Sequence, residues 1–96
     1  MRHRPAAPGT PITEEDHGSV LEVVGPATLL GPPAVSPSPG RALPGFRVTI
    51  AALQGAVTIH FAGDQTTVVG GLAEVVVPAN EARELLLLSQ GKWLVR

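Results

Sequence analysis

Few side chains in this 96-residue sequence have the type and spacing that catalysis or metal binding requires. The three histidines, His3, His17 and His60, are widely separated, and the chain contains no cysteine. Zinc sites place His and Cys ligands at short, regular intervals, so this spacing argues against a metal centre. His60 could act as a general base only beside a nucleophile or an orienting carboxylate, and no sequence pattern supplies either. We interpret it as a surface histidine.

Two further segments have the composition of binding loops. Glu14, Glu15 and Asp16 stand side by side before Gly18, whereas calcium loops place their ligands at alternate positions around a central glycine. Gly70-Gly71 could cradle a phosphate if a helix began directly after it, but strand-like residues follow. We interpret both segments as turns, for which Asp and Gly are typical residues. The sequence therefore predicts no catalytic residue, no cofactor and no metal, and the protein is not expected to be an enzyme.

Composition and charge restrict the partners of the protein. Seven Lys and Arg residues against eight Asp and Glu residues give a net charge of −1, and the aromatic residues are Phe46, Phe61 and Trp93. Nucleic-acid-binding proteins carry basic surfaces and often aromatic stacking platforms, so we expect no nucleic-acid partner. No run reaches the roughly 20 apolar residues of a membrane span. Because the charged, proline-rich start also lacks an apolar signal region, we expect synthesis in the cytoplasm and no membrane partner.

Short apolar runs between turn residues predict an all-β fold. Val48 and Ile50 alternate with Arg47 and Thr49, which is the period of a half-buried strand. About eight strands are expected, over residues 19–24, 27–30, 46–51, 56–61, 66–69, 72–77, 85–88 and 93–95. The two central strands should form a hairpin through Leu53-Gln54-Gly55. Together these runs predict a single antiparallel β-sandwich or jelly-roll-like domain over residues 14–96.

The last third of the chain is predicted to form a three-stranded antiparallel meander. Its strands would be Leu72–Val77, Leu85–Leu88 and Trp93–Val95, with Trp93 closing the core. The alternative is a helix that begins at Asn80 and ends at Leu88. That helix would have under three turns, with leucines on every side, so it would be marginal in isolation.

The run Leu85, Leu86, Leu87 and Leu88 is the predicted oligomer interface. Successive side chains of a strand point to opposite faces, so both faces of this strand are apolar. One face can line the core, while the other needs a second sheet or another copy of the chain, since monomers rarely expose large apolar patches. A small domain without disulfides also depends on tight packing or oligomerisation. We therefore expect a homo-oligomer.

Residues 1–13 are predicted to form an extended, proline-rich arm outside the domain. Three prolines at three-residue spacing favour a polyproline-like path without internal hydrogen bonds. Two interpretations remain open: a disordered tail, or an arm that docks on an acidic surface of a neighbouring protein. The particle-docking residues would be Arg2, His3, Arg4, Pro5, Pro8 and Pro11.

The order of these features resembles a small β-sandwich module of bacteriophage tail fibres, head fibres and related virion appendages. The matching pieces are 15–18, 32–45, 46–50, 56–61, 70–71 and 87–95. They span about Ile12 to Arg96, and the Ser89-Gln90-Gly91-Lys92-Trp93 close is the most distinctive of them.

The resemblance implies a non-enzymatic structural protein of a phage or phage-like particle, usually a homotrimer. In the virion it would be a capsid decoration protein or an appendage such as a fibre or spike base. Its partners would then be other copies of itself and the major capsid protein or another virion protein. The alternative is a β-sandwich module that binds a carbohydrate or a receptor through Trp93 or the long loop 31–45.

Overall fold

The computed structural model describes residues 3–5, 9, 12, 16–31, 45–61, 65–68, 70–89 and 91–96. These residues form β-strands and connections without an α-helix, so the predicted all-β class is confirmed. The strands are β1 (His3–Pro5), β2 (Val20–Val24), β3 (Ala27–Leu30), β4 (Arg47–Leu53), β5 (Val57–His60), β6 (Thr66–Thr67), β7 (Glu74–Val77), β8 (Ala82–Ser89) and β9 (Lys92–Val95).

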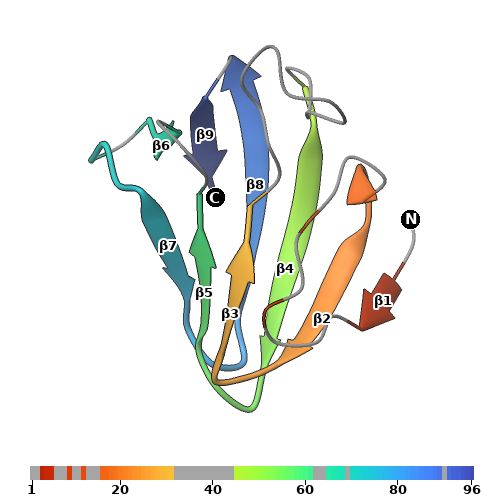
Figure 1. Ribbon diagram of the computed structural model, residues 1–96. Coiled ribbons are helices and arrows are strands. Elements are labelled where there is room, and N and C mark those ends of the chain that lie inside the picture. Colours follow the sequence, from red (N-terminus) through yellow and green to blue (C-terminus); the bar gives the residue numbers. More distant parts are fainter. Residues whose placement is uncertain are drawn as a thin grey trace.

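The strands lie in two sheets that pack face to face in a sandwich-like arrangement (Figure 1). The larger sheet has the order β1-β2-β4-β8-β9-β6, and the smaller has the order β3-β5-β7. Three pairings are antiparallel (β4 with β8, β8 with β9, β5 with β7), and four are parallel (β1 with β2, β2 with β4, β3 with β5, β6 with β9). The expectation that the strands are antiparallel throughout is therefore wrong, whereas the two packed sheets are consistent with the predicted β-sandwich. Parallel neighbours need a long crossover, and β2 reaches β4 by crossing through β3 in the opposite sheet.

Three connections at one end of the molecule carry the chain from one sheet to the other (Figure 1, bottom). They join β2 to β3 at Gly25-Pro26, β4 to β5 at Gln54-Gly55, and β7 to β8 across residues 78–81. The first two stack closely, because a Cβ atom on Gly25 would lie 2.3 Å from the Gly55 carbonyl oxygen. The third joins them through the Asn80 N–H, which donates to the Ala52 carbonyl at 2.8 Å. We refer to these connections as the three arches.

The arches correct two expectations about local pairing. The segment Leu53-Gln54-Gly55 does not close a hairpin, because β4 and β5 belong to different sheets. Likewise the last third is not a meander, since β7 pairs with β5 while β8 and β9 lie in the larger sheet. The alternative helix from Asn80 to Leu88 is also wrong, because this segment contains β8.

The core lies between the two sheets. The predicted inward faces of β4 and β5 are confirmed by the buried residues Val48, Ile50, Val57 and Ile59. Full burial of an aliphatic side chain stabilises a fold by about 1.5–3 kcal/mol. The complete set of buried apolar residues is Ile12, Leu21, Val23, Leu29, Phe46, Val48, Ile50, Ala52, Val57, Ile59, Phe61, Val77, Leu85, Leu87 and Trp93.

Trp93 is fully buried, as the sequence predicts, and organises one end of this core. Its ring stacks on Phe61 with centroids 5.5 Å apart and meets the edge of Phe46 at 5.9 Å. Its indole N–H donates to the Gln65 side-chain oxygen at 2.8 Å, so the buried polar group has a partner.

The described part of residues 1–13 packs on the same chain. Strand β1 pairs in parallel with β2. Gly9 and Ile12 donate backbone hydrogen bonds to the carbonyls of Thr28 and Leu30, each at 2.8 Å. Ile12 is also buried in the core. The described residues of this segment thus contact the domain from which the prediction separated them.

Candidate functional site

The four leucines of the predicted oligomer interface divide between two environments. Leu85 and Leu87 are fully buried in the chain's own core. Leu86 is half-buried on the outer face of the larger sheet, and 47% of Leu88 is exposed. Leu86 and Leu88 are therefore the members of the run that reach the surface, while Leu85 and Leu87 serve the fold.

Two further apolar residues continue this surface across the neighbouring strands. Leu86 pairs with Leu94 of β9, and Leu87 pairs with the buried Trp93, so Leu86 and Leu94 share the outer face. Val68 follows β6, and its N–H donates to the Trp93 carbonyl at 2.8 Å. Val68 is 49% exposed. We call Leu86, Leu88, Leu94 and Val68 the outer apolar strip.

Charged side chains of both signs border the outer apolar strip. Arg47 pairs with Leu86 across the β4–β8 ladder. On the other side, the Lys92 ammonium lies 3.4 Å from the Thr66 hydroxyl. Glu84, two residues before Leu86 on the same face, accepts a hydrogen bond from Arg96 Nε at 2.7 Å. An apolar centre with a mixed polar rim is the anatomy of a protein–protein contact.

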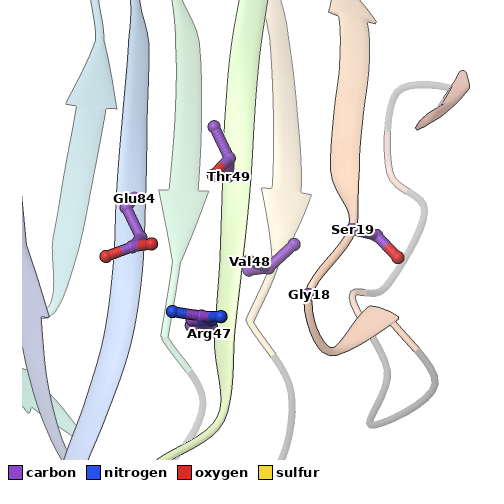
Figure 2. Close-up of a pocket in the computed structure, with 6 residues that line it drawn as sticks. All are labelled: Gly18, Ser19, Arg47, Val48, Thr49 and Glu84. Atoms are coloured by element: carbon purple, nitrogen blue, oxygen red, sulfur yellow. The ribbon is translucent and has the colours of Figure 1, made fainter. Parts of the chain in front are cut away.

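A small depression lies next to this rim (Figure 2). Gly18 and Ser19 come from the turn before β2, residues 47–49 from β4, and Glu84 from β8. Its volume is about 140 Å³, well below the roughly 300–1,000 Å³ of typical ligand pockets. The side chains of Arg47 and Glu84 lie on one side, while the Ser19 hydroxyl points away from them (Figure 2).

The depression lacks the geometry of a nucleophilic site. Ser19 is buried, and its hydroxyl has no hydrogen-bond partner among the described residues. A serine nucleophile needs a base within hydrogen-bonding reach. The nearby His17 Nδ1 instead accepts the Arg47 backbone N–H at 3.2 Å. The arrangement suits a buried turn before β2 better than acyl transfer.

The structure gives His60 a carboxylate partner that the sequence did not reveal. The β5–β7 register places Glu74 opposite His60, and its carboxylate lies 3.4 Å from His60 Nδ1. Both side chains are more than half exposed, at 56% and 58%. An exposed pair of this kind contributes at most about 1 kcal/mol. No described nucleophile contacts the ring, so the pair is a surface contact.

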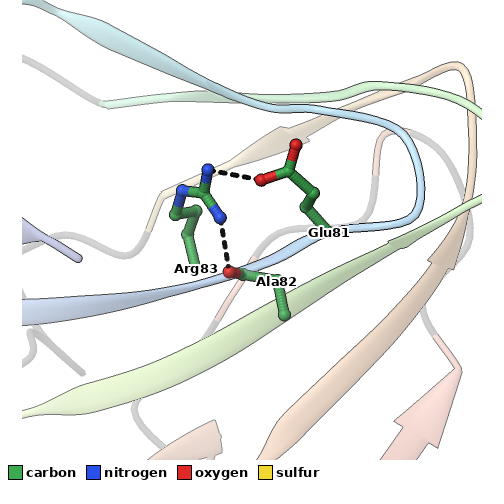
Figure 3. Close-up of polar contacts among 3 residues, drawn as sticks. All are labelled: Glu81, Ala82 and Arg83. Atoms are coloured by element: carbon green, nitrogen blue, oxygen red, sulfur yellow. Dashed lines mark hydrogen bonds and ion pairs between the residues drawn. The ribbon is translucent and has the colours of Figure 1, made fainter.

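A second polar contact lies where the arch between β7 and β8 ends (Figure 3). The Arg83 guanidinium donates to the Glu81 carboxylate at 2.6 Å and to the Ala82 carbonyl at 2.9 Å. These groups lie at the start of β8, and because both side chains are partly exposed the ion pair contributes at most about 1 kcal/mol.

The described residues provide few options for other ligands. Among them, no three His, Cys, Asp or Glu side chains gather closely enough to hold a metal ion. No helix in the described ranges is long and apolar enough to cross a membrane. Phe46, Phe61 and Trp93 are at most 5% exposed, so none of these rings can stack on a sugar. The carbohydrate site predicted at Trp93 is therefore not present at that residue.

The predicted docking residues are described only in part. The backbone of His3, Arg4 and Pro5 forms β1, and Pro5 is exposed. Arg2, Pro8 and Pro11 lie outside the described residues.

Sequence reasoning missed Leu94 and Val68, because their place beside Leu86 depends on which strands pair with β8 and β9. The sequence carries one weak signal: alternation with Trp93, which is predicted to close the core, points Leu94 outward. Comparison with protein-family models, with curated proteins and with solved structures finds no match.

Proposed function

We propose that the protein is a non-enzymatic structural protein whose copies associate through the outer apolar strip. One observation carries the proposal: after Leu85 and Leu87 have filled the core, Leu86 and Leu88 continue an apolar surface on the outer face. Burial of apolar area between copies contributes about 25 cal/mol for each Å² removed from water. Burial of the outer apolar strip between copies is therefore more favourable than its exposure to solvent.

We place this assembly in a phage or phage-like particle, as a capsid decoration protein or the base of a fibre or spike. The support is the resemblance of residues 12–96 to modules of virion appendages, which are usually homotrimers. Gly91 has φ of +74° between β8 and β9, and Trp93 is buried two residues later, so the most distinctive part of the resemblance has a structural role here. Other virion proteins are the proposed partners.

The N-terminal segment is the proposed docking element. Arg2, His3 and Arg4 add positive charge to a segment without acidic residues before Glu14, which suits an acidic surface on the particle. Three segments of a trimer that dock together would bind far more tightly than one. The described strand β1 lies at an edge of the larger sheet, where a neighbouring protein can reach it (Figure 1).

A matched pair of substitutions tests the assembly. Leu88 and Leu30 are each 47% exposed, but Leu88 belongs to the outer apolar strip and Leu30 lies on the smaller sheet. Leu88→Lys should dissociate the assembly, because it places a charge in an apolar contact, whereas Leu30→Lys should not. Sedimentation of the purified proteins at micromolar concentrations measures the difference.

A wild-type chain that stays monomeric throughout would overturn the proposal, and so would equal behaviour of the two variants. The alternative, a carbohydrate-binding module, has less support, because its predicted aromatic residue Trp93 is buried.

A further inference from the structure

Strand β7 is an edge that lacks most of the features by which proteins usually block strand pairing. Edges are commonly protected by proline, charged side chains (especially lysine), bulges, very short length or a covering segment. Here β1 contains Pro5, β6 has two residues, and the edge of β3 receives hydrogen bonds from Gly9 and Ile12. Strand β7, Glu74–Val77, has Glu74 as its one charged residue but contains neither proline nor lysine, and its ladder with β5 is regular. It lies at the rim of the molecule, left in Figure 1.

The phase of the β5–β7 ladder shows which backbone groups of β7 face outward. The Phe61 N–H donates to the Ala73 carbonyl at 2.9 Å, and the register pairs Ile59 with Val75. In an antiparallel ladder, hydrogen-bonded residues alternate with residues whose N–H and C=O point the other way. Ala73, Val75 and Val77 therefore bond to β5. The N–H and C=O groups of Glu74 and Val76 point to the open edge.

The open edge has a defined length. On one side, the Leu72 carbonyl accepts the Thr67 N–H at 2.8 Å, and the Leu72 N–H donates to the Thr67 hydroxyl at 3.0 Å. On the other side, Pro78 has no N–H, and its carbonyl accepts the Glu81 N–H at 3.1 Å. Within the described part of the chain, the outward backbone N–H and C=O groups that remain for pairing are therefore those of Glu74 and Val76. We call these groups the β7 edge.

We propose that the β7 edge binds the β7 edge of a second copy of this chain, antiparallel, around a two-fold axis at Val75. In this register each Glu74 lies opposite the other copy's Val76. The Glu74 N–H then donates to the other copy's Val76 carbonyl, and the Val76 N–H donates to the other copy's Glu74 carbonyl. Symmetry repeats both bonds, so every open group of both edges has a partner. The smaller sheets join into one sheet, β3-β5-β7-β7-β5-β3.

Other two-fold registers fit the β7 edge less well. An axis at Glu74 would place two glutamates directly opposite each other, which is destabilising. An axis at Val76 would place Glu74 opposite Pro78, which cannot donate a hydrogen bond. With the axis at Val75, each carboxylate lies beside a valine and keeps its own contact with His60. Val76, which is 56% exposed, would be partly covered. This self-complementarity favours a second copy over an unrelated strand.

The inference rests on the proposed function, since it names one contact through which copies assemble. It also adds a constraint, because a two-fold contact gives an even number of copies. The outer apolar strip lies on the larger sheet and the β7 edge on the smaller one, so one assembly can use both.

Backbone amide exchange of the wild-type protein tests the contact directly. In concentrated protein the amides of Glu74 and Val76 should exchange slowly, and dilution should release them. The Val75 amide bonds to β5 within the chain and should stay protected at both concentrations, which makes it an internal control. Exchange of Glu74 and Val76 that is fast at every concentration overturns the inference.

Val76→Pro provides the matching variant. The Val76 N–H points to the open edge, so proline removes it without removing a hydrogen bond to β5, a placement that edge strands tolerate. The variant should keep its circular-dichroism spectrum and halve the mass of the assembly. Val24→Lys, at a residue with nearly equal exposure on the larger sheet (55%), should leave the mass unchanged.

The outcomes separate this inference from the proposed function. A wild-type trimer with fast-exchanging Glu74 and Val76 overturns the β7 contact and leaves the proposed assembly intact. An even-numbered assembly that Val76→Pro halves supports the contact, even if Leu88→Lys has no effect. A wild-type monomer at all concentrations overturns both.

Discussion

Trp93 connects three parts of the chain that are distant in sequence. Its ring contacts Phe46 just before β4 and Phe61 just after β5, and its N–H donates to Gln65 just before β6. The large Trp93 side chain therefore contributes buried apolar area, aromatic contacts and a buried hydrogen bond at the same place in the core. This concentration of contacts makes Trp93 a sensitive residue for stability.

Trp93→Ala should destabilise the protein by about 3–5 kcal/mol, a large share of the stability of a small domain. Trp93→Phe should cost less, because a ring still fills most of the space beside Phe61. Denaturant unfolding followed by circular dichroism measures both. A cost below about 1 kcal/mol for Trp93→Ala would contradict the packing, since large-to-small changes in a core cost more.

The burial of individual residues was largely accessible from the sequence. Alternation in 46–51 and 56–61 correctly placed Val48, Ile50, Val57 and Ile59 in the core. Alternation could not reveal the contact between His60 and Glu74, because that depends on which strand lies beside β5. For the same reason, a run of four leucines predicted two apolar faces but not the neighbours, Leu94 and Val68, that extend one of them.

At the scale of elements, the partners of the strands were the part that the sequence could not determine. A short connection with Gln54 and Gly55 suits a hairpin and an arch equally well, because both need a tight turn between alternating segments. The decisive information is the close approach of Gly55 to Gly25, which are far apart in sequence. The parallel pairing of β2 with β4 accompanies this stacking. It produces no pattern in the local amino-acid sequence.

The stacked arches predict a strong effect of a small substitution. A Cβ atom at Gly55 would lie 2.5 Å from the Gly25 carbonyl carbon and from the Pro26 nitrogen. Gly55→Ala must therefore push two backbones apart, and overpacking of this kind costs about 1–3 kcal/mol or more.

Gly71→Ala is the matched control, since Gly71 has φ of +61° and open space around its Cβ position. Gly71→Ala should lower the free energy of unfolding only by the cost of placing alanine at a positive φ, about 1–2 kcal/mol. Thermal unfolding of both variants distinguishes the effects. If Gly55→Ala were the milder substitution, the arches would not be stacked in solution as they are here.

At the scale of the whole molecule, the two proposed contacts lie on different sheets. The larger sheet presents the outer apolar strip on its face, and the smaller sheet presents the β7 edge at its rim. A face contact removes side-chain area from water, whereas an edge contact completes backbone hydrogen bonds. A different substitution should therefore disrupt each contact: Leu88→Lys disrupts the face contact, and Val76→Pro disrupts the edge contact.

Assembly should also make the thermal stability of the protein depend on its concentration. Association stabilises the folded chain by mass action, so a hundredfold rise in protein concentration adds up to about 2.7 kcal/mol per association step. For a domain of this size, 1 kcal/mol shifts Tm by about 4–8 °C. We expect Tm of the wild-type protein to rise by several degrees between dilute and concentrated samples.

The slope of Tm against protein concentration, compared between variants, identifies the contact that stabilises the fold. Leu88→Lys and Val76→Pro should each reduce the slope, because each removes one association step, and the double variant should abolish it. Leu30→Lys should keep the wild-type slope, since its exposed side chain lies outside both contacts. A wild-type Tm that is independent of concentration would mean that the exposed apolar residues are tolerated by a lone chain. The outer apolar strip would then have no role in stabilising an assembly.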